Sequence, residues 1–345
     1  MVMKVDDSDL SLHLKDPKTI RNFLAKLEKK PYGESFQLGD VEHVVDVVST
    51  GSLVLDIATG IGGYPRGRIV QIAGWESSGK TTHALKAIAN LQAKGGTAAF
   101  IDTEYALDPR WATQLGVDMA AVAWVQVDDL ETAGEIAIEM ANSGSFDMIV
   151  FDSVAGAPIK AVVDGELGDA NMGRRAKIMS DFMPKLNGPV ARNKVWMIFT
   201  NQLRDSLNIY APKPVAPGGH ALTFHSTMII ELKAKKIRAG RGDATHVDVT
   251  ATVEKNKMSP PGKTVTYTMD FDGYIDIVDE LATIITSADN SEALGVVRGG
   301  AWYTLPEGML PGIEDRKFNG RDKILEALAE VDVFEAAKKY VLDNV

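Results

Sequence analysis

Short apolar runs alternate with longer amphipathic stretches through the middle of the chain. Four of these runs are predicted to be strands, at 69–73, 97–102, 148–152 and 196–200. Segments with apolar residues at helix-like spacing separate them. Continuously apolar strands that alternate with helices are typical of a parallel sheet buried on both faces. The pattern therefore predicts an α/β fold with a mostly parallel, twisted sheet flanked by helices.

Polar and apolar residues alternate more regularly later in the chain, at 227–233, 247–254 and 264–270. A period of two is typical of strands with one exposed face, so these segments predict an antiparallel extension of the sheet. Beyond residue 277, a turn at 299–303 and a helical pattern over 321–342 indicate a small α+β region.

The chain begins with a separate amphipathic segment. Residues 16–30 place Ile20, Phe23 and Leu27 on one helical stripe. Such a helix has no core of its own, so it must pack on its own body or on a neighbouring subunit. We therefore divide the chain into an N-terminal helix and strand at 1–45, a core at 46–276 and a C-terminal α+β domain at 277–345.

Composition narrows the class of protein. The 345 residues are 45% apolar and 24% charged, which is ordinary for a globular domain. The chain has no run of eighteen apolar residues and no apolar leader, so we expect no membrane segment. The absence of cysteine excludes disulfides and thiolate chemistry and fits a cytoplasmic protein. A net charge of −10 argues against indiscriminate nucleic-acid binding but leaves room for a local basic groove.

The chemistry is concentrated in residues 74–82, which read Gly-Trp-Glu-Ser-Ser-Gly-Lys-Thr-Thr. This is the phosphate-loop pattern, with Gly74, Gly79, Lys80 and Thr81 at the required spacing. Glycines let backbone N–H groups converge on phosphate oxygens, while the lysine reaches the β and γ phosphates and the threonine hydroxyl ligates Mg²⁺. A predicted strand precedes the motif and a predicted helix follows it. We therefore favour binding of ATP and Mg²⁺ over an incidental glycine-rich turn.

Two acids follow predicted strands, where α/β nucleotide sites are built. Asp152 ends an apolar strand, which is the Walker B pattern for holding Mg²⁺ through a water; the alternative is a cap for a following helix. Glu104 follows the strand at 97–102 and is the candidate base for the attacking water, or else a solvated loop acid. Gln202 could sense a γ-phosphate, or belong to an ordinary turn. Trp111 is either a nucleobase stacker or a core residue.

At this point the residues resemble a family. Glu76–Thr82, Phe100–Pro109 and Leu115–Asp118 resemble bacterial RecA recombinases, as do Ser49–Asp56, Gly165–Asp169, Ile198–Arg204, Gly218–Leu222 and Lys255–Lys257, in the same order along the chain. The resemblance covers essentially the whole core and implies a RecA-like P-loop ATPase fold. Generic P-loop proteins share only the first of these motifs.

The resemblance implies roles for the nucleotide site. Asp152 would support Mg²⁺ together with Thr81, Glu104 would activate the water, and Gln202 would sense the γ-phosphate. Asp108 and Trp111 would lie at the adenine. The triphosphate would be cradled by Gly74, Glu76, Ser77, Ser78, Gly79, Lys80, Thr81 and Thr82.

Lys255 and Lys257 would, by the same resemblance, reach the ATP of a neighbouring subunit as arginine fingers do. A site completed in this way implies a helical homo-oligomer with ATP at the subunit interface. The N-terminal element at 1–45 would then dock on the adjacent core.

The family's two DNA-binding loops map to 164–175 and 205–217. Residues in and after them would contact single- and double-stranded DNA without reading its sequence, Met172 as a wedge between bases and the cations along the phosphate backbone. Without the resemblance, the cations after the first loop would be a solvated helix face. The implied DNA-binding set is Met172, Gly173, Arg174, Arg175, Lys177, Ser180, Arg204, Gly218 and Gly219.

The chain also departs from the family pattern. Tyr105 replaces a usual histidine, and Pro184 and Thr223 replace basic residues near the two loops. Arg174 and Arg175 are additional cations that could compensate. The C-terminal residues lack the acidic tail common in cellular members, which suggests weaker autoinhibition or a phage-type homologue.

The resemblance thus predicts an ATP-dependent DNA recombinase with DNA-stimulated hydrolysis. Two rivals share the ATPase core: a hexameric helicase, which usually carries a large helical N-terminal domain, and a RadA-like repair factor, which usually carries a cysteine zinc finger. A rival of another class is a filament protein that uses ATP only as a clamp, against which Glu104 argues.

Overall fold

The computed structural model describes residues 45–163, 171–204, 217–238 and 244–345. Residues Val45–Val345 form a compact unit. The predicted N-terminal element lies outside the described residues, and the three-part division of the chain stays a prediction. None of the helices in the described ranges is long and apolar enough to cross a membrane.

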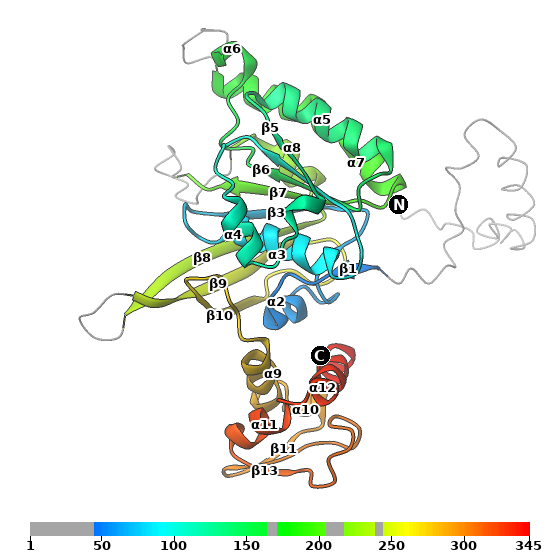
Figure 1. Ribbon diagram of the computed structural model, residues 1–345, viewed down its shortest axis with the longest axis vertical. Coiled ribbons are helices and arrows are strands. Elements are labelled where there is room, and N and C mark those ends of the chain that lie inside the picture. Colours follow the sequence, from blue (N-terminus) through cyan, green and yellow to red (C-terminus); the bar gives the residue numbers. More distant parts are fainter. Residues whose placement is uncertain (1–44, 164–170, 205–216, 239–243) are drawn as a thin grey trace, which may run out of the picture. The chain divides into compact units, whose positions relative to one another are not determined.

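A large mixed sheet lies at the centre of this unit (Figure 1). Its strands lie side by side in the order β10-β9-β8-β3-β7-β6-β4-β5. Neighbours from β8 to β5 pair in parallel, while β9 pairs antiparallel with both β8 and β10. This arrangement confirms the predicted α/β fold and its antiparallel extension. The strands are β3 (Ile69–Gly74), β4 (Ala98–Asp102), β5 (Val122–Gln126), β6 (Met148–Asp152), β7 (Trp196–Gln202), β8 (Met228–Arg238), β9 (Ala244–Asn256) and β10 (Thr264–Asp270).

Helices cover both faces of the sheet, because its inner strands are apolar on both sides. Val150 of β6 belongs to the core under one face, and its neighbour Phe151 belongs to the core under the other. The first face is covered by α2 (Leu53–Ala58), α3 (Lys80–Gln92) and α4 (Pro109–Gln114). The second is covered by α5 (Leu130–Ser143), α7 (Asn171–Arg192) and α8 (His220–His225). Two short helices, η2 (Met119–Ala121) and α6 (Lys160–Val163), lie in the connections.

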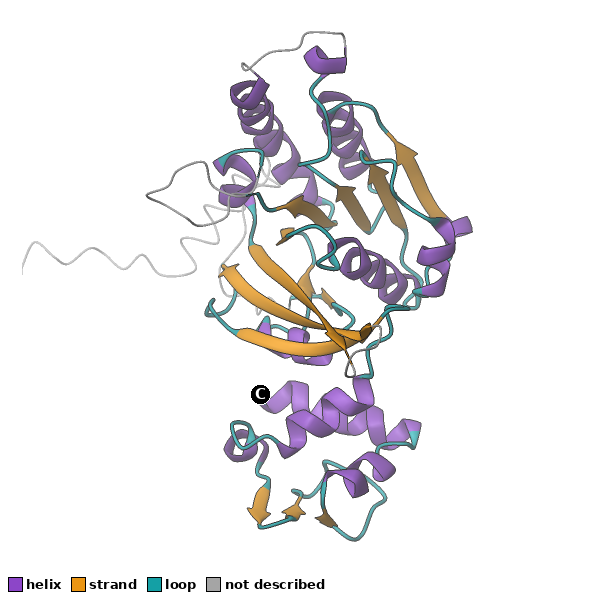
Figure 2. Ribbon diagram, turned by 90° about the vertical axis from the view of Figure 1, so that its left-hand side faces the viewer, coloured by secondary structure: helices purple, strands orange, loops and turns teal. Residues whose placement is uncertain are grey.

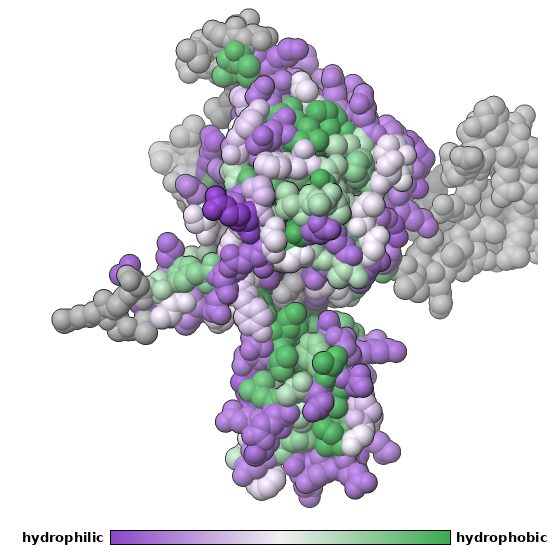
Figure 3. Space-filling view, viewed as in Figure 1, coloured by the Kyte–Doolittle hydropathy of each residue, from purple (hydrophilic) through white to green (hydrophobic). Residues whose placement is uncertain are grey.

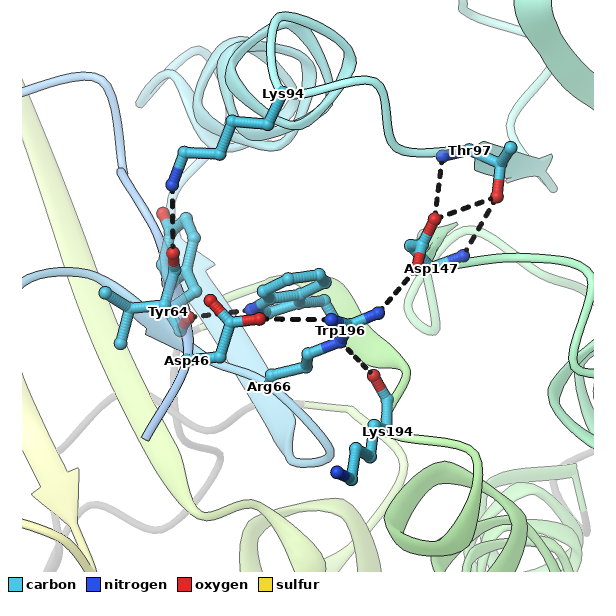
Figure 4. Close-up of polar contacts among 9 residues, drawn as sticks. Asp46, Tyr64, Arg66, Lys94, Thr97, Asp147, Lys194 and Trp196 are labelled. Carbon is cyan, nitrogen blue, oxygen red and sulfur yellow. Dashed lines mark hydrogen bonds and ion pairs between the residues drawn. The ribbon is translucent and has the colours of Figure 1, made fainter. Parts of the chain in front are cut away.

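The amino-terminal edge of the sheet is held by one arginine (Figure 4). The Arg66 guanidinium donates to Asp147 at 2.5 Å and to Asp46 at 3.1 Å, and its Nε donates to the Lys194 carbonyl at 2.9 Å. It also lies 4.6 Å from the ring centroid of Trp196. These contacts tie the start of β6 and β7 to the short pair β1 (Val47–Val48) and β2 (Tyr64–Pro65).

The C-terminal residues surround a third apolar cluster, to which Leu53 of α2 also contributes. The Glu280 carboxylate, on α9, accepts hydrogen bonds from the Ser52 hydroxyl at 2.7 Å and the Leu53 amide at 2.5 Å. Helices and three short strands make up this region (Figure 2), and its visible surface mixes hydrophilic and hydrophobic residues (Figure 3). The elements are α9 (Ile277–Thr286), α10 (Ser291–Leu294), β11 (Val297–Gly299), β12 (Trp302–Thr304), β13 (Lys317–Asn319), α11 (Arg321–Ala327) and α12 (Val331–Asn344).

Candidate nucleotide site

The phosphate loop connects the end of β3 to the start of α3, as its motif requires. Gly79 precedes the helix with φ of +89°, a left-handed conformation that favours glycine. A Cβ on Gly74 would lie 2.3 Å from the Ser78 hydroxyl and 2.6 Å from the Leu232 carbonyl oxygen. Both glycines are therefore required by the local geometry, and the loop is a tight turn at a helix N-terminus, where anions bind readily.

Lys80 lies folded across this loop. Its ammonium group donates to the carbonyl oxygens of Gly74 at 3.1 Å and Trp75 at 2.7 Å. Burial lowers the pKa of Lys80, opposed by the nearby carboxylates of Asp152, Glu104 and Glu76. The buried Ser78 hydroxyl has no hydrogen-bond partner among the residues that the structure describes. A charged donor and an unsatisfied hydroxyl on one loop suit phosphate oxygens.

Asp152 and Thr81 meet directly beside the loop. The Thr81 hydroxyl donates to one carboxylate oxygen of Asp152 at 2.7 Å, and the Thr200 hydroxyl donates to the other at 2.5 Å. Burial raises the pKa of Asp152, and these two hydrogen bonds oppose the shift. The pair brings together oxygen ligands of the kind that Mg²⁺ prefers. Neither donor is a helix N–H, so the contacts differ from those of the helix-cap alternative; the magnesium role itself stays a prediction.

Glu104 and Gln202 come from different strand ends and meet. The Gln202 amide donates to both carboxylate oxygens of Glu104, at 3.0 and 3.3 Å. The Ser153 hydroxyl also donates to Glu104. A Cβ on Gly156 would lie 2.3 Å from Glu104 Cγ, so the glycine makes room for this side chain. Glu104 is thus held by neighbouring residues, unlike a solvated loop acid.

Asp102 organises the loop that carries Glu104, and sequence reasoning missed it. This buried carboxylate accepts from the backbone amides of Glu104 at 3.2 Å, Ala106 at 3.3 Å and Leu107 at 3.4 Å. An aspartate that ends an apolar run and precedes a turn is the signal that could have identified it. The conformation of the loop after β4 is therefore stabilised by the carboxylate of Asp102, the last residue of that strand.

The residues assigned to the adenine have structural partners. The Asp108 carboxylate caps α4 by accepting from the Arg110 amide at 2.8 Å. Trp111 is half-buried and packs against the core. A Cβ on Gly273 would lie 3.2 Å from the indole, so this glycine approaches the ring closely. Contact of Asp108 or Trp111 with a base stays a prediction.

Lys255 and Lys257 project from the end of β9 onto α8. Lys255 Nζ donates to the carbonyl oxygens of Thr223 at 2.6 Å and Phe224 at 3.1 Å, and Lys257 Nζ donates to that of Phe224 at 3.3 Å. Cations are stabilised at the C-terminal end of a helix, where carbonyls lack partners. Burial and the nearby Lys257 lower the pKa of Lys255.

Some of the residues assigned to DNA pack against the segment after β6 or against α7, and the others are exposed. Arg175 donates to the carbonyl oxygens of Val154 at 2.7 Å and Ala155 at 3.0 Å, directly after β6. Gly218 and Gly219 have φ of +98° and +69°, and a Cβ on them would lie 3.0 Å from Val154 and 3.1 Å from Ala176. The exposed residues are Gly173, Arg174, Lys177, Ser180 and Arg204.

Most of both loops lies outside the described residues, at 164–170 and 205–216, as does the side chain of Met172. Asn201 connects the site to the far end of the second loop, because its amide donates to the Pro217 carbonyl at 3.0 Å. The DNA contacts stay predictions.

A phosphate loop between a strand and a helix, with acids at the ends of neighbouring parallel strands, defines the class of P-loop nucleotide-binding α/β proteins. Residues 18–276 match the family described as RecA N-terminal domain. The chain is 38% identical over 335 residues to Protein RecA of Listeria welshimeri, covering 93% of this chain and 94% of the relative. It is 38% identical over 330 residues to Protein RecA of Enterococcus hirae, covering 93% and 92%. The chain belongs to the RecA family.

Proposed function

We propose that this protein is an ATP-dependent DNA recombinase. It forms filaments on single-stranded DNA, promotes homologous pairing and strand exchange, and hydrolyses ATP in a DNA-stimulated reaction. RecA relatives suggest recombinase function. The observation that supports it best is the contact between Glu104 and Gln202 beside the phosphate loop, because it joins the candidate base to the candidate γ-phosphate sensor.

The chain's own residues suit a nucleotide and its metal. Lys80 exchanges the carbonyls of its own loop for phosphate oxygens, and the unpartnered Ser78 hydroxyl gains an acceptor. Thr81 and, through a water, Asp152 would hold Mg²⁺, which would neutralise charge on the phosphates. Asp102, Glu104 and Asp152 gather carboxylates at this edge of the sheet, where the ammonium group of Lys80 opposes the charge of two of them, Asp152 and Glu104.

Glu104 accepts the proton of the attacking water at a carboxylate oxygen. Gln202 holds Glu104 while no γ-phosphate is present and turns to the phosphate once ATP binds. The same strand end carries Asn201, bonded to Pro217, so the movement reaches the second DNA loop. ATP thereby favours the state that grips single-stranded DNA.

Lys255 and Lys257 act on the ATP of the neighbouring subunit. Charged groups that are satisfied only by a helix end are available for exchange with phosphate, which is the stronger partner. Hydrolysis then depends on assembly. Base pairing between the DNA strands supplies sequence discrimination. The protein contributes contacts to the phosphate backbone of the DNA through Arg174, Arg175 and Lys177.

The deciding experiment measures ATP hydrolysis with and without single-stranded DNA across a salt series, followed by joint-molecule formation with a homologous duplex. We expect stimulation by DNA that weakens with salt, and joint molecules that require ATP. Absence of stimulation at low salt contradicts the recombinase function. Stimulation with duplex unwinding but no joint molecules favours the helicase alternative, and ATP-dependent DNA binding without turnover favours the clamp.

A further inference from the structure

His83 is a buried polar side chain that the proposed mechanism does not use. Sequence reasoning placed it on the helix after the phosphate loop, and it does lie in α3 with its side chain fully buried. Its Nδ1 lies 2.7 Å from the Gly79 carbonyl oxygen, and its Nε2 is hydrogen-bonded to the Tyr267 hydroxyl. A histidine inside an apolar core therefore connects the phosphate loop to strand β10.

The direction of both hydrogen bonds follows from the partners. A carbonyl oxygen only accepts, so Nδ1 of His83 carries the hydrogen. Nε2 of the neutral ring is then an acceptor, and the Tyr267 hydroxyl must donate to it. The Gly79 carbonyl also accepts from the His83 backbone amide at 3.0 Å, so one residue binds the same oxygen twice. In the other tautomer Nδ1 would carry no hydrogen and would lose its bond to the Gly79 carbonyl, whereas Nε2 could still donate to the Tyr267 hydroxyl oxygen.

Strand β10 lies directly against the phosphate loop at this point. A Cβ on Gly79 would lie 3.5 Å from His83 Nδ1 and 3.6 Å from the Met269 methyl group. Tyr267 and Met269 are consecutive inward-facing residues of β10, and the chain then runs to Gly273, which approaches Trp111. The same strand thus contacts the loop proposed to hold phosphates and leads to the residue proposed to hold the base.

We propose that His83 and Tyr267 are a positioning pair that fixes the phosphate loop from β10 and thereby sets the affinity for nucleotide, although neither contacts it. The inference rests on the proposed nucleotide site. Gly79 is the last residue of the loop before Lys80, so the orientation of its peptide decides where the neighbouring amide groups point. Loss of the Tyr267 hydroxyl leaves Nε2 of the buried ring unsatisfied, and a movement of the ring to recover a partner displaces the Gly79 carbonyl that Nδ1 holds.

The test is a double-mutant cycle on nucleotide binding, with His83→Leu, Tyr267→Phe and the double variant. We expect Tyr267→Phe to weaken ADP and ATP binding by about tenfold, since the buried Nε2 of His83 loses its hydrogen-bond donor. KM for ATP rises in parallel while kcat stays near the wild-type value. The double variant binds no more weakly than the weaker single variant, because the two changes remove one shared interaction.

Tyr64→Phe is the matched control, since the Tyr64 hydroxyl is also buried but has no hydrogen-bond partner within the described part of the chain. It should leave the Kd unchanged. A lower unfolding midpoint of the nucleotide-free variants with unchanged Kd and KM would overturn the proposal, because the pair would then be merely structural. If Tyr267→Phe fails to fold, ¹⁵N NMR of histidine-labelled wild-type protein decides: a hydrogen on Nδ1 of His83 supports the proposal, and a hydrogen on Nε2 alone overturns it. Wild-type protein that binds no nucleotide refutes the nucleotide site itself, which is a distinguishable result.

Discussion

The two groups of residues proposed to act on ATP are built in different ways. Around the phosphate loop, Asp102, Asp152 and Glu104 are held by several donors from α3, from neighbouring strand ends and from the loop after β4, and Asp102 is only 1% exposed. At the end of β9, Lys255 and Lys257 lie near the surface and are bonded to the carbonyls at the end of α8.

This difference shows which of the two groups a single subunit holds in a fixed geometry without a neighbouring subunit. Buried polar groups are costly unless they are satisfied, so the geometry of the first group is fixed during folding. The lysines keep only contacts to a helix end and solvent, which can be exchanged at modest cost. We therefore expect changes in the first group to act within a subunit and changes in the lysines to act across an interface.

The largest effect on turnover is expected for the lysines. Lys255→Ala/Lys257→Ala should lower DNA-stimulated ATP hydrolysis by on the order of 10³-fold, as loss of a charge supplied in trans does. Nucleotide binding to the isolated subunit should change little.

Mixing makes this prediction sharper. Equal amounts of Lys255→Ala/Lys257→Ala and Glu104→Gln subunits should regain activity, because about one interface in four then combines an intact glutamate with intact lysines. If well-formed mixed filaments still fail to hydrolyse ATP, the lysines act on the ATP of their own subunit. The two groups of residues would then not differ in acting within a subunit or across an interface.

Glu104→Gln should have the next largest effect. An amide cannot accept the proton of the attacking water, so hydrolysis should fall by roughly 10²-fold or more, while ATP-dependent DNA binding is retained. Steady-state turnover and DNA-binding anisotropy with ATP measure the two quantities. Turnover that survives intact would mean that another group is the base.

Many residues of the fold and of the candidate site could be predicted from the sequence, and others could not, for reasons that differ from residue to residue. The apolar run ending in Asp152 specifies both a buried strand and an acid at its end, so pattern and chemistry agree there. Thr200 was predicted only as the end of a strand, because its bond to Asp152 depends on β7 lying beside β6. Ser153 was missed for the same reason, because local sequence does not tell which strand ends are neighbours. Asp102 is different, since it accepts from amides two to five residues further on, and the turn after its strand was a local signal for it. His83 was predicted as a helix residue, but its partner is 184 positions away.

Asp102→Asn should have a smaller effect than either change above. The amide replaces one acceptor oxygen with a donor, which then opposes an amide of the loop that carries Glu104. We expect kcat to fall by about tenfold with KM for ATP nearly unchanged, since one such mismatch costs on the order of 1–3 kcal/mol. The matched control is Asp276→Asn at the N-cap of α9, which should leave both stability and the position of Glu104 nearly unaltered because asparagine caps a helix about as well as aspartate. Equal losses of kcat in both variants would show that the loop is not held by Asp102 in particular.

The smallest effect on turnover is expected far from both groups, at Glu280. Burial raises the pKa of Glu280 from 4.5 to about 7. The folded state therefore binds more protons than the unfolded state between these pH values, so this group makes stability fall as pH rises through that window. Glu280→Gln, which cannot ionise, should keep turnover within about twofold and gain up to about 3 kcal/mol relative to wild type between pH 4.5 and 8. Asp56, whose pKa burial raises to about 6, titrates in the same window and also raises the pKa of Glu280, so the difference between the two proteins includes the loss of this repulsion. Urea unfolding at several pH values measures that difference, and parallel profiles for the two proteins would mean that Glu280 is already charged in the folded state near pH 5.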